Sequence, residues 1–189
     1  MKKPWVVVVL LVVLGIGLRA KAQNQTSQFE AYGGYDYARF NVNAYVPGVA
    51  PSASYNANGG GGQLEYNPNK WLGIVGDLAG YLVTKGTPLA GAFSYLFGPR
   101  INLRRGKITP FAQILFGGIV ATSGIGHSGA ANAFAMTAGG GMDFNVSELI
   151  SIRPVQAEYF LTKFPDGLNN RQNNFRFSSG IVFRSGRVR

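Results

Sequence analysis

The segment that decides the fold is Asn173–Arg184, which reads NNFRFSSGIVFR. In an extended strand, alternate side chains point to opposite faces. One face would then carry Phe175, Phe177, Ile181 and Phe183, and the other mainly Arg176, Ser178, Gly180 and Arg184. Such a strand needs an apolar environment outside and a polar one inside. A transmembrane β-barrel provides both, because lipid-facing and lumen-facing side chains alternate and closure leaves no strand edge.

Seven further segments alternate in the same way, so that Asn173–Arg184 becomes the eighth strand. They are Gln28–Phe40, Gly59–Asn67, Trp71–Val83, Gly91–Leu103, Lys107–Ala121, Ala133–Asn145 and Leu149–Lys163. The connections between them alternate between long and short. This asymmetry is typical of outer-membrane barrels, which have short periplasmic turns and longer outer loops. The sequence therefore predicts an all-β, eight-stranded antiparallel up-and-down transmembrane β-barrel with both termini in the periplasm.

The seventh segment is irregular, because Arg153 falls in phase with the apolar residues. Pro154 offers a β-bulge that could turn Arg153 inward. Aromatic residues gather near both ends of the strands, as membrane interfaces favour. We expect Tyr66, Trp71, Phe144 and Phe183 to form the inner girdle, and Tyr37, Tyr81, Phe93, Phe134 and Phe175 the outer one.

The N-terminus predicts export. Lys2 and Lys3 precede an apolar run from Trp5 to Leu18, and Ala20-Lys21-Ala22 has the small-residue pattern of a cleavage site. We expect residues 1–22 to be a signal peptide and residues 23–189 to be one barrel domain. The chain contains no cysteine, which excludes a disulfide scaffold, a cysteine-ligated metal site and a thiol enzyme. Its formal charge of +10 does not indicate nucleic-acid binding, because no basic run is interleaved with aromatic residues.

Nine ionisable residues are predicted to point into the lumen. They are Glu30, Asp36, Glu65, Asp77, Arg100, Asp143, Arg153, Glu158 and Arg176. Side chains fill the interior of an eight-stranded barrel, and buried charges must be paired. We therefore expect a structural plug of ion pairs, with an ion or proton path as the alternative. Because these acids outnumber the arginines, we also expect an acidic excess.

Other candidate chemistry is weak. His127 and Ser128 invite a hydrolase interpretation, but they stand among glycines without an evident third group to orient a base. A single histidine does not make a metal site. Neither Gly59–Gly62 nor Gly139–Gly141 precedes a helix that could bind phosphate. We expect no catalytic residue, cofactor or metal.

Basic residues collect in the predicted turns and the C-terminal tail. They are Lys70, Arg104, Arg105, Lys107, Arg184, Arg187 and Arg189, opposed there only by Glu148. We expect a solvated rim, or one attracted to anionic headgroups or to acidic groups of the cell wall.

The hairpin rhythm, the signal peptide, the segment IRPVQAEYFLTKF and the aromatic-rich last strand resemble the small eight-stranded barrels similar to the OmpA transmembrane domain. The resemblance covers Gln28–Phe183, after which Arg184–Arg189 follow in place of a terminal aromatic residue. It implies a non-enzymatic outer-membrane protein with a structural or surface-interaction role and a plugged or very narrow polar lumen. Implied partners are outer-membrane lipids, the outer-membrane assembly machinery, and cell-wall or extracellular ligands. The alternatives are a lipid-modifying enzyme, a small-solute channel and a soluble lipocalin-like barrel with apolar residues inside.

Overall fold

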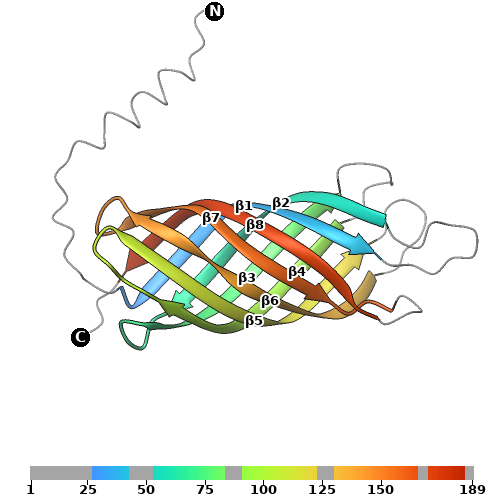
Figure 1. The fold of residues 1–189 in the computed structure, drawn as a ribbon, viewed down its shortest axis with the longest axis horizontal. Coiled ribbons are helices and arrows are strands. Elements are labelled where there is room, and N and C mark those ends of the chain that lie inside the picture. The colour runs from blue at the N-terminus through green and yellow to red at the C-terminus, as the bar shows by residue number, and fades with distance from the viewer. Residues whose placement is uncertain (1–26, 43–52, 84–90, 123–129, 166–169, 186–189) are drawn as a thin grey trace, which may run out of the picture.

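The chain forms a closed barrel of eight antiparallel strands in the order β1 to β8 (Figure 1). The computed structural model describes residues 27–42, 53–83, 91–122, 130–165 and 170–185. The strands are β1 Phe29–Val42, β2 Ala53–Tyr66, β3 Leu72–Val83, β4 Gly91–Asn102, β5 Ile108–Thr122, β6 Ala130–Asn145, β7 Ile150–Thr162 and β8 Gln172–Ser185. Pairing of β1 with β8 closes the sheet, so that no strand edge is left open. The predicted barrel is confirmed, whereas the predicted signal peptide lies outside the described residues.

Two strands begin three or more residues earlier than the sequence pattern predicts. β2 starts at Ala53 rather than Gly59, and β6 at Ala130 rather than Ala133. The residues before Gly59 show little apolar alternation, yet their backbone continues to pair with β1 as far as Val42 opposite Ala53. Backbone hydrogen bonding is independent of side-chain type, so the ladder extends beyond the hydrophobic signal.

Three tight turns lie at one end of the barrel, where β1 begins and β8 ends; we call this the turn end. The side chain of Asn69 accepts hydrogen bonds from the backbone amides of Trp71 and Leu72, at 3.0 and 2.9 Å. The Ser147 hydroxyl accepts similarly from the amides after it. Gly106 has a φ of 60°, which a glycine adopts without strain. The opposite end, where β1 ends and β8 begins, is the loop end.

The outer surface of the barrel is apolar. Large hydrophobic side chains point outward from all eight strands, and Leu64 is 71% exposed. No helix that could cross a membrane occurs among the described residues. The polar side chains lie inside, so the soluble lipocalin-like alternative, which requires the opposite polarity, is wrong.

The interior changes character along the barrel axis. Toward its loop end lies most of an apolar cluster formed by Ala38, Ala57, Val75, Ala79, Tyr81, Leu96, Leu115, Ile119, Ala135 and Phe160. Tyr81 was predicted in the outer girdle, but it is only 2% exposed and packs edge-on against Phe40 inside the barrel. Tyr81 lies four residues after Asp77 on β3 and so points to the same, inward face. The prediction of the outer girdle did not take this alternation into account. Toward the loop end the lumen is therefore only partly polar, whereas the sequence predicts a polar lumen.

Candidate functional site

All nine predicted lumen residues are buried inside the barrel. Three arginines in its middle make close ion pairs. Arg100 Nη1 lies 2.6 Å from Glu65 Oε2, and Arg153 Nε lies 2.7 Å from Asp143 Oδ1. Because guanidinium groups stay charged, these carboxylates supply the compensation that burial requires.

Arg176 holds two carboxylates at once. It contacts Asp77 through two nitrogens, at 2.8 and 3.1 Å, and its Nε donates to Glu158 Oε2 at 2.7 Å. Its Nη1 also lies 3.4 Å from the hydroxyl oxygen of Tyr81. Arg176 therefore links β3, β7 and β8 across the interior at the border of the apolar cluster.

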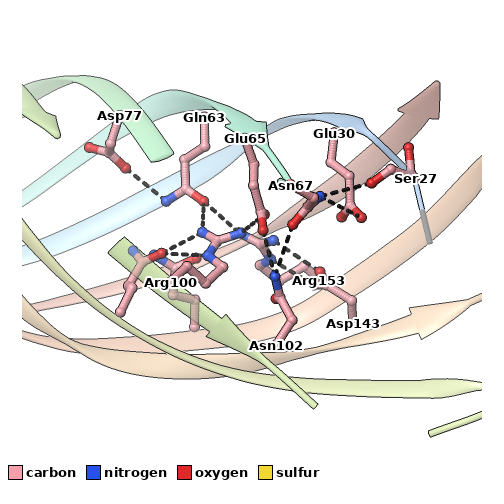
Figure 2. A network of polar contacts seen from close by, with 12 residues as sticks. Ser27, Glu30, Gln63, Glu65, Asn67, Asp77, Arg100, Asn102, Asp143 and Arg153 are labelled. Atoms are coloured by element: carbon pink, nitrogen blue, oxygen red, sulfur yellow. Dashed lines mark hydrogen bonds and ion pairs between the residues drawn. The ribbon is translucent and has the colours of Figure 1, made fainter. Parts of the chain in front are cut away.

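Three glutamines connect the ion pairs to one another. Figure 2 shows Gln63 between Arg100 and Arg153, with its amide nitrogen donating to Asp77 at 2.8 Å. Gln113 joins Arg100 to Glu158 in the same manner, and Gln156 joins Arg153 to Glu158.

In each of these glutamines the carbonyl oxygen accepts from a guanidinium and the amide nitrogen donates to a carboxylate. A side-chain amide is neutral and carries its acceptor and its donors on two separate atoms at one end, so it can contact a cation and an anion at once. The sequence analysis did not include these glutamines among the lumen residues. Their positions could have been predicted, because they alternate with the lipid-facing residues of β2, β5 and β7. The middle of the interior is thus a connected network of ion pairs and hydrogen bonds. Few of its described side-chain N and O atoms lack a partner.

Aromatic rings complete the packing of the arginines. The Phe111 ring lies 4.3 Å from Arg100 Cζ and 4.4 Å from Arg153 Cζ, so two guanidiniums share one ring. Tyr32 lies on Arg153 as well, at 4.6 Å. Such cation–π contacts strengthen when water is excluded. They indicate that the arginines are fixed in place.

A bulge brings Arg153 into this network. The pairing of β7 with β8 shifts between Arg153 and Gln156, and that of β6 with β7 shifts between Met142 and Phe144. Arg153 is fully buried, whereas Pro154 and Val155 after it are exposed. The bulge expected at Pro154 is confirmed. It turns the Arg153 side chain into the lumen, although the alternation of the strand alone would place it on the lipid-facing side.

The turn-end mouth of the barrel holds a separate group around Glu30. Arg104 Nη1 lies 2.8 Å from Glu30 Oε1, and Arg184 Nε lies 3.8 Å from Glu30 Oε2. Both arginines were predicted on a solvated rim, but their side chains are only 14% and 8% exposed. The rim prediction is wrong for these two, because a buried carboxylate attracts them inward. Arg187 and Arg189 lie outside the described residues.

These two arginines also change the charge balance of the interior. The expected acidic excess counted only Arg100, Arg153 and Arg176. With Arg104 and Arg184 added, every inward carboxylate except Asp36 lies within 4 Å of a guanidinium in the described part of the chain. Asp36 faces Ser178 across the β1–β8 ladder. Its carboxylate also occupies the space above Gly61, where a Cβ would lie 2.0 Å from Asp36 Oδ2.

The arrangement holds charge in the interior, because guanidinium groups lie against the inward carboxylates other than Asp36. Within the described ranges, no three His, Cys, Asp or Glu side chains group as they would around a metal ion. His127 and Ser128, the residues of the hydrolase alternative, lie outside these ranges.

The sequence matches the outer membrane protein beta-barrel domain family over residues 8–183. The chain belongs to this family. The resemblance expected from the hairpin rhythm and the last strand is thereby confirmed, and the protein is an outer-membrane β-barrel. A comparison with curated protein sequences finds no match.

Solved structures of other outer-membrane barrels share its fold. Neisserial surface protein A is 12% identical with a TM-score of 0.68, and the alignment covers 84% of this chain and 97% of that one. Ail, the attachment invasion locus protein of Yersinia pestis, is 18% identical with a TM-score of 0.54, covering 84% and 98%. OprG from Pseudomonas aeruginosa is 11% identical with a TM-score of 0.59, covering 87% and 99%. At these identities the similarity concerns the fold alone.

Proposed function

We propose that this outer-membrane barrel is a non-enzymatic surface-interaction protein whose lumen is closed. The observation that carries the proposal is the filled interior. From the turn end inward, Glu30 and its arginines, the arginine–glutamine network and the apolar cluster follow one another. At the border of the last two, the rings of Phe40, Tyr81 and Phe160 pack together, with centroids 5.6 to 6.5 Å apart. A solute would have to break both the ion pairs and this aromatic contact.

The proposal includes an orientation. Exported with the signal peptide at residues 1–22 and inserted by the outer-membrane assembly machinery, the barrel would hold its turn end and both termini in the periplasm. The loop end would then face outward. The short turns at the other end support this orientation, because outer-membrane barrels keep short turns on the periplasmic side.

The surface to be recognised lies at the loop end. In the described part of the chain, the exposed charged side chains near this end are Arg39, Lys163 and Arg171, all basic. The described acidic residues are buried apart from Glu148, which lies in a turn at the opposite end. Ail has been crystallised with the heparin analogue sucrose octasulfate. We propose that the loop end of this barrel contacts extracellular polyanions of that kind.

Sucrose octasulfate binding to the protein in zwitterionic detergent tests the recognition. We expect binding that weakens as salt rises, because exposed charges are screened. Replacing Arg39, Lys163 and Arg171 with glutamine should weaken it further, whereas replacing Lys70 and Arg105 at the turn end should not. Equal loss in both variants would mean that the attraction follows net charge, and the assignment to the loop end would fail.

The closed lumen has its own test. In planar bilayers, the purified protein should give no stable unitary conductance. A Phe160→Ala variant removes one ring of the aromatic contact and should show transient openings. Steady channels from the unaltered protein would support the small-solute channel instead.

The orientation can be read from accessibility, because the chain has no native cysteine. A cysteine at Ala130, exposed at the loop end, should react with an impermeant maleimide on intact cells. One at Glu148, exposed at the turn end, should react only after lysis. The reverse pattern would overturn the orientation. A lipid-modifying enzyme remains the alternative in which His127→Ala would abolish an activity on lipid substrates.

A further inference from the structure

The turn-end mouth has more positive charge than its own carboxylate can compensate. Arg184 lies directly opposite Glu30 in the β1–β8 ladder. Arg104 follows β4 and reaches the same carboxylate from the opposite wall of the closed barrel. Two guanidiniums therefore share Glu30. The other carboxylates of this region, Glu65 and Asp143, are already paired with Arg100 and Arg153.

The hydrogen-bond donors of these two arginines point to what is missing. In Arg104 and in Arg184, both Nε and Nη2 are buried without a hydrogen-bond partner among the described residues. The 3.8 Å from Arg184 Nε to Glu30 is too long for a hydrogen bond. Nε and Nη2 form one edge of the guanidinium, the edge that binds two oxygens of a carboxylate or phosphate side by side. Arg104 and Arg184 therefore each have an Nε–Nη2 edge without a hydrogen-bond partner among the described residues.

Thr109 adds a third unpartnered donor at this end. The isolated bridge of Arg105 with Ile108 continues the β4–β5 register and places Thr109 opposite Arg104. Its hydroxyl is buried and has no partner in the described part of the chain. The other buried side-chain N and O atoms that lack a partner among the described residues are single hydroxyls, on Tyr32, Ser94 and Thr137, which carry no charge. Among the residues that the structure describes, the charged donors without a partner therefore lie at the mouth.

We propose that the turn-end mouth binds one small soluble oxyanion, a phosphate or a carboxylate, between the Nε–Nη2 edges of Arg104 and Arg184. Water can satisfy the N–H groups, but it leaves the surplus positive charge of a mostly buried site uncompensated. An oxyanion satisfies both needs. A lipid headgroup on the outer surface of the barrel does not meet side chains that point into its interior, so the ligand comes from solution. This inference is independent of what the loop end recognises.

Glu30 and the bound oxyanion would compete for the same two cations. This competition gives the site a signature that an ordinary structural ion pair lacks. Removing an arginine weakens anion binding, whereas neutralising Glu30 strengthens it, because both guanidiniums become available to the ligand. The substitution Glu30→Gln keeps the shape of the side chain and its ability to accept from Asn67, which lies 3.4 Å from Glu30 Oε1.

The test is titration calorimetry and thermal unfolding of the full chain in zwitterionic detergent, with phosphate and acetate as separate probes. Chloride at matched ionic strength is the reference for both. We expect saturable binding of at least one probe and a midpoint of unfolding that rises with its concentration. Arg104→Gln and Arg184→Gln should each weaken binding at least tenfold, and Glu30→Gln should tighten it about tenfold. Arg105→Gln, an exposed neighbour in the same turn, should leave it unchanged.

Three results would overturn the proposal. The first is a response to both probes no greater than that to chloride, which would mean that water alone occupies the mouth. The second is equal weakening by Arg105→Gln and Arg104→Gln, which would mean diffuse screening. The third is a Glu30→Gln variant that binds no more tightly than the unaltered protein. This last measurement also decides the matter if an arginine variant fails to fold.

Discussion

Replacing Arg176 with methionine should be among the most destabilising single changes in the barrel. Arg176 is buried and is the cation within hydrogen-bonding distance of both Asp77 and Glu158. Without it, two carboxylates remain in the interior with only glutamine amides as partners. Breaking a buried ion pair by removing one member costs about 3–5 kcal/mol. Because two carboxylates lose their cation, we expect the upper part of this range.

The measurement is urea unfolding in detergent or lipid vesicles, followed by the fluorescence of Trp71. With a denaturant slope of about 2 kcal/mol per molar urea, a loss of about 4 kcal/mol lowers the midpoint by about 2 M. The control is Arg105→Met, which removes an exposed guanidinium from a turn and should change stability by less than about 0.5 kcal/mol.

A triple variant separates stranded charge from lost packing. Adding Asp77→Asn and Glu158→Gln to Arg176→Met removes the uncompensated carboxylates and should restore more than half of the lost stability, because a fully neutralised site no longer buries charge. If Arg176→Met stays within 1 kcal/mol of Arg105→Met, water solvates the network and the dry-plug interpretation is refuted. If the triple variant restores nothing, the loss arises from packing.

Three other substitutions test the close packing at Gly61, the aromatic contact at Phe160 and the turn at Asn69. Gly61→Ala would place a Cβ 2.0 Å from Asp36 Oδ2 and should destabilise the barrel by about 1–3 kcal/mol, whereas Gly76→Ala, with nothing within 4 Å, should be nearly neutral in the same urea titration. Phe160→Ala, at a fully buried position, should cost about 3–5 kcal/mol, measured by the midpoint of unfolding; a cost below 1 kcal/mol would show that the aromatic contact is loose. Asn69→Ala should lose about 1 kcal/mol, because two backbone amides lose their acceptor, and an unchanged midpoint would mean that water replaces it.

How far the barrel can be predicted from the sequence follows from the period of a strand. Because side chains alternate strictly, the sequence of β8 separates its lipid-facing phenylalanines from Arg176 without any knowledge of the partner strands. The same alternation gives the strand count, the inward side of each acid and the irregularity at Pro154. Tyr81 was misplaced only where the girdle expectation was preferred to this alternation.

The sequence alone determined which face of each strand is inward, but the tertiary structure decided which inward residues meet. Arg176 and Asp77 are 99 positions apart and come together because strand tilt and closure bring β3 and β8 to opposite sides of one narrow interior. The same holds for Gln63 between two arginines, and for Arg104 and Arg184 at Glu30. A local pattern contains the period of a strand but neither its tilt nor its register. Only the closed barrel fixes both, and with them the pairing of its charges.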